Sequence, residues 1–188
     1  MTSKSPPFIL SLFLTLSFTL PVSAEDISAG EQKASACIGC HGQRGGSGSP
    51  QWPSLAAQQS PYLVNQLKAF KTGSRSNAMM QSIATHLSSE DMDNLAAYFS
   101  SQKAGKAGGD SALAKAGESK ASMCLGCHGL SAEGNGQFPR LAGQHPEYLE
   151  QQLKNFKSGI RKNGPMQALA ANLSEADIKA LAVYFGSL

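Results

Sequence analysis

"CIGCHG", residues 37–42, contains two cysteines three positions apart and a histidine directly after the second one. The pattern returns as "CLGCHG", residues 124–129, so these two segments hold all 4 cysteines of the 188-residue chain. Residues i, i+3 and i+4 of a helix lie on one face. We therefore expect each segment to present two thiols and one imidazole on the same side of a short helix.

Three kinds of site use a cysteine pair of this spacing. A redox dithiol accompanies a βαβ pattern, but no convincing alternating strand is visible here and the repeated histidine would have no role. A structural zinc ion needs four ligands, so each half would have to supply one more. Covalent haem attachment uses all three residues, because the thiols bind the haem vinyl groups and the imidazole reaches the iron. We predict haem attachment through Cys37, Cys40, Cys124 and Cys127, with His41 and His128 as iron ligands.

The chain is a tandem duplication. When the sequence is aligned with itself, three long segments of the first half match three segments of the second half, in the same order. The matches are 34–42 with 121–129, then 52–77 with 138–163, then 87–99 with 173–185. They cover almost the full length of each half, so both halves should share one fold.

The duplication predicts two small domains. The stretch "SQKAGKAGGDSA", residues 101–112, is rich in Gly, Ala, Ser and Lys and lacks large apolar residues, which is typical of a linker. We expect an N-terminal domain over residues 25–101, a linker over 102–112 and a C-terminal domain over 113–188. Each domain has about 75 residues, a size at which an apolar core alone is marginal and a bound cofactor is common.

Helical periodicity predicts an all-α fold for each half. The first helix of each half leads into the cysteine pair, the second begins at a proline, and the third begins at a Ser-x-x-Asp capping signal. The first helices are expected over about 27–40 and 113–127, and the third after Ser88 and Ser174. The second helix opens at the proline of "SPYLVNQLKAFK", and its apolar stripe of Leu63, Leu67 and Phe70 is repeated by Leu149, Leu153 and Phe156.

The first 24 residues have the pattern of a secretory signal peptide, cleaved after Ala24. A retained membrane anchor is the alternative, but the apolar run from Phe8 to Val22 is shorter than the roughly 20 residues that a spanning helix needs. Loss of Lys4 would reduce the formal net charge from +3 to +2. This near-neutral chain has no run of Lys and Arg, so nucleic acid is not an expected partner.

An electron-transfer haem needs a second iron ligand, and a methionine thioether is a soft donor that raises the reduction potential. The candidates are Met79, Met80, Met92, Met123 and Met166. Met166 aligns with Met80, whereas Met79 aligns with Pro165, which has no ligating atom. Met92 aligns with Ile178 and is expected in the core, and Met123 directly precedes a cysteine pair. We predict Met80 and Met166 as the second iron ligands.

Other residues invite weaker hypotheses. His86 aligns with Asn172 and His145 with Gln59, so neither histidine has a duplicated role, and we expect surface or hydrogen-bonding functions. The haem-ligating histidines should each donate a ring N–H to a backbone carbonyl, and the carbonyls of Pro53 and Pro139 are suitable acceptors. Arg75 and Arg161 either neutralise haem propionates or are solvated surface charges, and Asn77 and Asn163 could donate to a thioether or a propionate.

The two Cys-x-x-Cys-His segments, "WPSLAAQ" and "FPRLAGQ" after them, and the methionines ahead of the third helix resemble the dihaem class I cytochromes of the cytochrome c4 family. The resemblance implies two facing helical domains, each with one covalent haem c held by His and Met. It also implies a periplasmic location, or peripheral attachment to the inner membrane, and electron transport from quinol-oxidising complexes to terminal oxidases. "SLAAQ" replaces "RLAGQ" in the first half, so no symmetric role is implied for Arg140.

The leading functional hypothesis is an electron carrier that is not an enzyme, because two protein ligands per iron leave no site for a substrate. A second hypothesis is a fixed electron-transfer subunit of a larger oxidoreductase. A third is a dihaem enzyme of the peroxidase or thiosulfate-oxidising type, for which His86, close to Met80 in sequence, is the only hint of a ligand switch.

Overall fold

The computed structural model describes residues 26–188, together with Met1. Within residues 26–188 the chain is helical, and its only β-type pairing is an isolated bridge between Asn135 and Phe138. The all-α prediction is confirmed. The predicted signal peptide, residues 1–24, lies outside the described residues apart from Met1.

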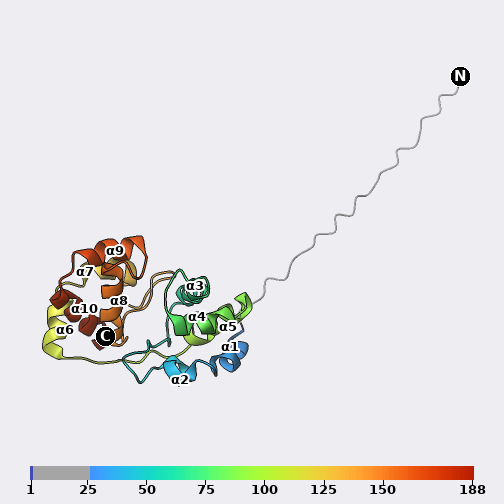
Figure 1. The fold of residues 1–188 in the computed structure, drawn as a ribbon, viewed down its shortest axis with the longest axis horizontal. Coiled ribbons are helices and arrows are strands. Elements are labelled where there is room, and N and C mark those ends of the chain that lie inside the picture. Colours follow the sequence, from blue (N-terminus) through green and yellow to red (C-terminus); the bar gives the residue numbers. More distant parts are fainter. Residues whose placement is uncertain (2–25) are drawn as a thin grey trace.

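The two halves form two lobes with the same order of helices (Figure 1). The first lobe contains α1 (Ile27–Ala34), α2 (Ile38–His41), the 3-10 helix η1 (Gln43–Gly45), α3 (Ser60–Lys71), α4 (Ala78–Thr85) and α5 (Ser89–Ser100). The second contains α6 (Ser111–Glu118), α7 (Ser122–His128), α8 (Pro146–Lys157), α9 (Gly164–Ala171) and α10 (Glu175–Ser187).

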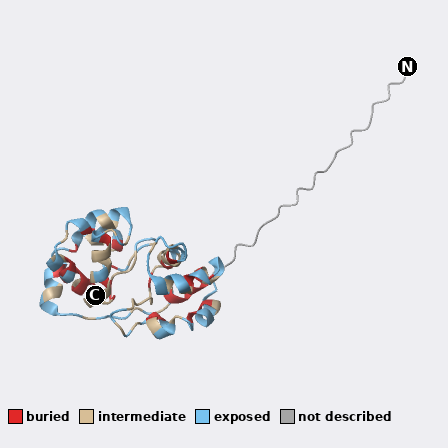
Figure 2. Ribbon diagram, in the orientation of Figure 1, coloured by how far each residue is buried: buried red, intermediate tan, exposed pale blue. Residues whose placement is uncertain are grey.

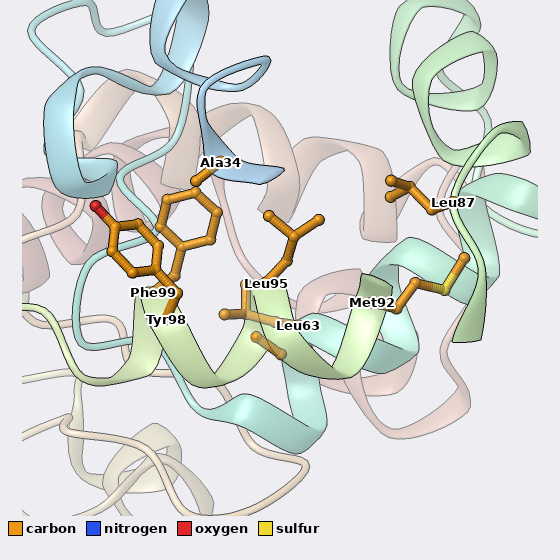
Figure 3. Packing of buried hydrophobic residues seen from close by; sticks show 8 residues of the cluster. Ala34, Leu63, Leu87, Met92, Leu95, Tyr98 and Phe99 are labelled. Atoms are coloured by element: carbon orange, nitrogen blue, oxygen red, sulfur yellow. The ribbon is translucent and has the colours of Figure 1, made fainter. Parts of the chain in front are cut away.

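The last helix of each lobe, α5 or α10, carries much of the lobe's core. Figure 2 shows buried residues concentrated along these helices. In the first lobe, Met92, Leu95 and Phe99 of α5 pack with Ala34 of α1 and Leu63 of α3 (Figure 3). Met92 is only 2% exposed, which confirms its predicted place in the core.

The predicted capping boxes begin both of these helices. The Ser88 hydroxyl accepts the Asp91 N–H at 3.0 Å, and the Asp91 carboxylate accepts the Ser88 N–H at 2.9 Å. Ser174 and Asp177 form the same pair at the start of α10. Asp91 also forms an ion pair with Lys33 of α1, and Asp177 forms one with Lys120, just after α6, so the start and the end of each lobe are linked.

A glycine allows the first helix of each lobe to cross the last one at very short range. A Cβ at Gly30 of α1 would lie 2.1 Å from the Asn94 carbonyl oxygen of α5. A Cβ at Gly117 of α6 would lie 2.1 Å from the Ala180 carbonyl oxygen of α10. No side chain fits at these distances, so both crossings depend on glycine.

Two features of the fold differ from the sequence prediction. The helix expected over 27–40 is broken between Ala34 and Ile38, and the helix expected from 113 begins at Ser111 and is broken between Glu118 and Ser122. Tertiary packing explains both breaks. Packing of α1 against α5 and of α6 against α10 sets the directions of the two first helices. The cysteine segments run in another direction, toward the loops that come after them. The second difference is that α4 and α9 were not predicted, because they are short and uncharged.

The lobes contact each other through pairs of equivalent hydrogen bonds. Gln58 of the first lobe exchanges two bonds with the backbone of Arg140, at 3.0 and 2.7 Å. Gln144 of the second lobe exchanges two with the backbone of Ser54, both at 2.9 Å. Each glutamine side chain is only 6% exposed, so these contacts lie inside the interface.

A second pair of contacts involves the loops that follow the cysteine segments. The Gln59 side chain donates to the Glu133 carbonyl at 3.0 Å, and His145 Nε2 lies 2.8 Å from the Ser47 carbonyl oxygen. Gln59 and His145 are equivalent positions, and Ser47 and Glu133 lie in corresponding loops. His145 is therefore a hydrogen-bonding residue between the lobes, in line with its predicted role.

Replacing Gly30 with alanine should force α1 away from α5. We expect the free energy of unfolding to fall by about 1–3 kcal/mol, the usual cost of overpacking, measured by denaturant titration of the full chain. Gly48→Ala is the control, because a Cβ there meets no atom within 4 Å. Equal effects of the two substitutions would contradict the close crossing.

Candidate haem-binding sites

The histidine of each cysteine segment is held by a proline carbonyl. His41 is the last residue of α2 and His128 the last residue of α7. The Nδ1 atoms lie 2.8 Å from the carbonyl oxygens of Pro53 and Pro139. These are the acceptors predicted from the sequence. Because a carbonyl can only accept, Nδ1 carries the proton, and the neutral ring keeps its lone pair on Nε2.

Both rings are suited to bind a metal through Nε2. Burial lowers the pKa of His41 and His128, although the proline carbonyls act in the opposite direction, so the neutral form is favoured. No hydrogen bond reaches either Nε2 from residues 26–188, and in that range no fully buried side-chain nitrogen or oxygen lacks a partner. Each Nε2 therefore faces accessible space with a free lone pair.

No disulfide joins any of the four cysteines. Cys37 and Cys124 are half-buried against the cores of their lobes, and burial raises the pKa of both thiols, with Cys40 and Cys127 adding to the effect. In the described part of the chain, no three side chains of His, Cys, Asp or Glu come together as a metal-ion site.

The predicted methionines lie near the start of α4 and α9. The Asn77 side-chain oxygen accepts the N–H of Met80 at 2.9 Å, and Asn163 does the same for Met166 at 3.2 Å. These asparagines are helix caps, a role that the sequence hypothesis of donation to a thioether or propionate did not include. Met80 and Met166 are half-buried, whereas Met79 is 49% exposed.

Histidine and methionine come from elements that do not pack on each other. α2 packs against η1, whereas α4 packs against α3. The only buried residue of α4 is Ala84, so its apolar side chains Met80 and Ile83 are left partly uncovered by protein. The donor set of thiols, imidazole and thioether fits haem c, which these residues would hold.

A lysine side chain forms a hydrogen bond at the end of each methionine-bearing segment. Lys71, the last residue of α3, donates through Nζ to the carbonyl of Leu87, just beyond α4. Lys157 makes the equivalent bond to the carbonyl of Leu173. This contact was not predicted, although the lysine is duplicated at the same position in both halves.

Two arginines meet at the interface between the lobes. Arg75 and Arg161 both donate to the same two side-chain oxygens, those of Gln66 and Gln152, at 2.8 to 3.0 Å. Each also donates to the tyrosine of the other lobe: Arg75 to Tyr148 at 2.9 Å and Arg161 to Tyr62 at 3.0 Å. The guanidinium groups lie 4.6 Å from the ring centres of Phe70 and Phe156. These arginines are not solvated surface charges.

This arginine cluster contains two positive charges and no carboxylate. Burial opposes the charge of Arg75, but Tyr148 and Tyr62 together raise its pKa, so the group stays ionised. Burial also opposes ionisation of Tyr62, but Arg161 and Arg75 outweigh it and lower the pKa of that phenol. The two positive charges of the cluster favour the binding of anions, and haem propionates are anions.

Comparison with known proteins identifies a family model and several proteins that are similar to this chain. The family model described as Cytochrome c matches residues 27–103 and 114–188. Cytochrome c4 of Pseudomonas aeruginosa is 39% identical over 196 aligned residues, which include 96% of this chain and 98% of that protein. The crystal structure of reduced recombinant cytochrome c4 from Pseudomonas stutzeri has a TM-score of 0.82 and 39% identity, covering 88% of this chain and 100% of that one.

A thiosulfate dehydrogenase structure from Marichromatium purpuratum contains a similar region. It has a TM-score of 0.78 and 31% identity, and the match covers 86% of this chain but only 40% of the dehydrogenase chain. The similarity to that enzyme is therefore confined to part of a longer chain.

Removing the amine of Lys71 should loosen the methionine-bearing segment. In Lys71→Met we expect amide hydrogen exchange in α4 to become roughly fivefold faster, because a partly exposed charged hydrogen bond contributes about 1 kcal/mol. Lys68→Met is the control, since Lys68 is exposed on the same helix and forms no side-chain hydrogen bond within residues 26–188. Unchanged exchange in α4 of Lys71→Met would show that the lysine does not hold the segment.

Proposed function

Because this chain belongs to the cytochrome c4 family of dihaem electron carriers, we propose that it carries electrons in the periplasm from a quinol-oxidising complex to a terminal oxidase. Two covalent haem c groups, one in each tandem cytochrome c domain, are its cofactors. The chain is an electron carrier and not an enzyme. The observation that carries the finer proposal is that both lobes keep a complete set of thiols, held imidazole and methionine.

We assign the individual site residues as follows. Cys37 and Cys40 attach the haem of the first domain, and His41 and Met80 bind its iron. Cys124 and Cys127 attach the second haem, with His128 and Met166 as its iron ligands. The free Nε2 of each histidine and the partly uncovered methionine-bearing helix support this assignment.

Each bound haem supplies a reversible one-electron change at its iron. The residues of the chain restrain the proposed iron ligands during this change. The proline carbonyls hold the imidazole rings in one orientation, and the lysine tethers restrain the methionine-bearing segments. Saturated coordination by two protein ligands leaves no open position for a substrate. The arginine cluster holds the positive charge that propionates need at the interface between the lobes.

The location and domain limits are part of the proposal. The predicted signal peptide, residues 1–24, supports export, followed by domains over 25–101 and 113–188 with a linker over 102–112. Among the described residues, no helix has the length and apolar character required to cross a membrane. Surface lysines would guide docking to redox partners, which makes transfer rates dependent on salt.

One alternative keeps specific support, namely a fixed electron-transfer subunit of a larger oxidoreductase. It rests on the similarity to part of the thiosulfate dehydrogenase chain. Co-purification of the native protein with a catalytic subunit in a constant ratio would favour it. The peroxidase-type alternative is not supported, because the family consists of carriers, and His86 is an exposed residue that ends α4.

The methionine assignment predicts a distinct spectroscopic result. The oxidised protein should show the weak red charge-transfer band of sulfur-ligated ferric haem, and Met80→Ala should remove about half of it and lower one of the two potentials. Met79→Ala is the matched control and should leave the band unchanged. The reverse pattern would make Met79 the ligand.

The carrier function predicts two successive one-electron steps at different potentials. The surroundings of the haems differ, since Phe138 packs edge-on to His128 with ring centres 6.2 Å apart, while Trp52 has the equivalent position in the first half. The reduced protein should bind carbon monoxide poorly and consume little peroxide, but should accelerate electron flow from a quinol-oxidising complex to an oxidase. Rapid stoichiometric carbon monoxide binding with fast peroxide turnover would contradict a carrier.

A further inference from the structure

One peptide group in each lobe lies between an iron-binding histidine and a glutamine of the other lobe. We propose that Gln144 and Gln58 are positioning residues that tune the iron ligand of the opposite lobe. Gln144 acts on His41 through the peptide that joins residues 53 and 54. Gln58 acts on His128 through the peptide that joins residues 139 and 140. This inference rests on the proposed iron-binding role of the two histidines.

The first of these chains starts at His41. Its Nδ1–H donates to the Pro53 carbonyl oxygen at 2.8 Å. The N–H of the same peptide group belongs to Ser54 and donates to Gln144 Oε1 at 2.9 Å. Gln144 Nε2 then donates to the Ser54 carbonyl at 2.9 Å, so the glutamine holds Ser54 from both sides.

The second chain repeats these contacts with the lobes exchanged. His128 Nδ1–H donates to the Pro139 carbonyl oxygen at 2.8 Å, and the Arg140 N–H donates to Gln58 Oε1 at 2.7 Å. Gln58 Nε2 donates to the Arg140 carbonyl at 3.0 Å. The residue that pairs with the glutamine is Ser54 in the first lobe and Arg140 in the second. Only the backbone of that residue takes part, so the contact is the same in both lobes.

Local structure fixes the direction of both glutamines. Each Oε1 also accepts the N–H of the next residue, Gln59 at 3.0 Å or His145 at 3.1 Å. The residue before each glutamine has a left-handed backbone conformation, with φ of 55° at Ala57 and 75° at Gly143. Alanine adopts this conformation at an energetic cost, so the first lobe retains some strain at the position that directs Gln58 across the interface.

The expected effect on the iron has a definite sign. A hydrogen bond accepted from a peptide N–H polarises the peptide and makes its carbonyl oxygen a stronger acceptor. A stronger acceptor at Nδ1–H gives the imidazole more electron density, which raises its basicity as a metal ligand. A more basic ligand favours the ferric state, so each glutamine lowers the potential of the haem in the other lobe.

The test compares glutamine variants of the full holoprotein. Gln144→Met removes both bonds to Ser54, while Gln144→Glu keeps the acceptor and loses the donor. Gln58→Met is the mirror experiment. Gln59→Met is the matched control, because Gln59 also bonds to the backbone of the other lobe, at Glu133 and Gly136, but not to a peptide whose carbonyl accepts from a histidine ring.

Two measurements report the effect of each glutamine on the histidine of the opposite lobe. The first is the potential of each haem, with the first-lobe step identified by its change in Met80→Ala. The second is the NMR shift of the histidine Nδ1–H in the reduced protein, which reports the strength of its hydrogen bond. Failure of the methionine assignment would appear in the charge-transfer band of the unmodified protein, separately from either readout at His41.

Gln144→Met should raise the first-lobe potential and move the His41 Nδ1–H resonance upfield, with little change in the second lobe. Gln58→Met should do the same for the second lobe and His128. Gln144→Glu should keep the first-lobe potential at or below its original value, a result that mere loosening of the interface would not give. A shift confined to the glutamine's own lobe, equal shifts in both lobes, or the same response to Gln59→Met would overturn the proposal.

Discussion

The hydrogen bond from each histidine ring to a proline carbonyl is the contact on which the rest of each lobe depends. It joins the short cysteine-bearing helix to the loop that follows, and it selects the tautomer that leaves Nε2 free. The same loop reaches the interface with the other lobe, because the next backbone groups pair with a glutamine there. Orientation of the metal ligand and docking of the lobes are therefore properties of one continuous piece of chain.

The arginine cluster shows how charge is managed where the lobes meet. Two guanidinium groups of like charge lie close enough to share amide oxygens, with phenols and aromatic rings as their other neighbours. Burying like charges together is unfavourable unless an anion is nearby. We propose that haem propionates provide such anions, which would link cofactor binding to the stability of the interface. A change at either arginine should therefore affect both lobes.

Much of this organisation could be predicted from the sequence, because the informative residues are duplicated. The cysteine segments, the capping boxes at Ser88 and Ser174, and the proline acceptors follow from spacing and repetition. Other features depend on contacts between segments far apart in the chain. Gly30 looks like any helical glycine until α5 is placed against it, and nothing in the sequence indicates that Arg75 pairs with residues of the second half. The helices α4 and α9 were missed because they are short and contain no charged residue that would mark their ends.

Much of the interface between the lobes is built like that of a twofold homodimer, since the glutamine–backbone and arginine–tyrosine contacts each occur twice with the partners exchanged. Fusion of the halves into one chain changes what substitutions can do to it. In a homodimer every substitution alters both copies of a contact at once, but in a tandem chain one copy can change alone. Gln59 and His145 are an example, because the side chains differ while both still bond to the backbone of the opposite loop. A tethered pair also has an effective concentration on the order of millimolar, so a few hydrogen bonds suffice to keep the lobes together. The two electron-transfer sites are thus free to diverge in sequence without loss of their association.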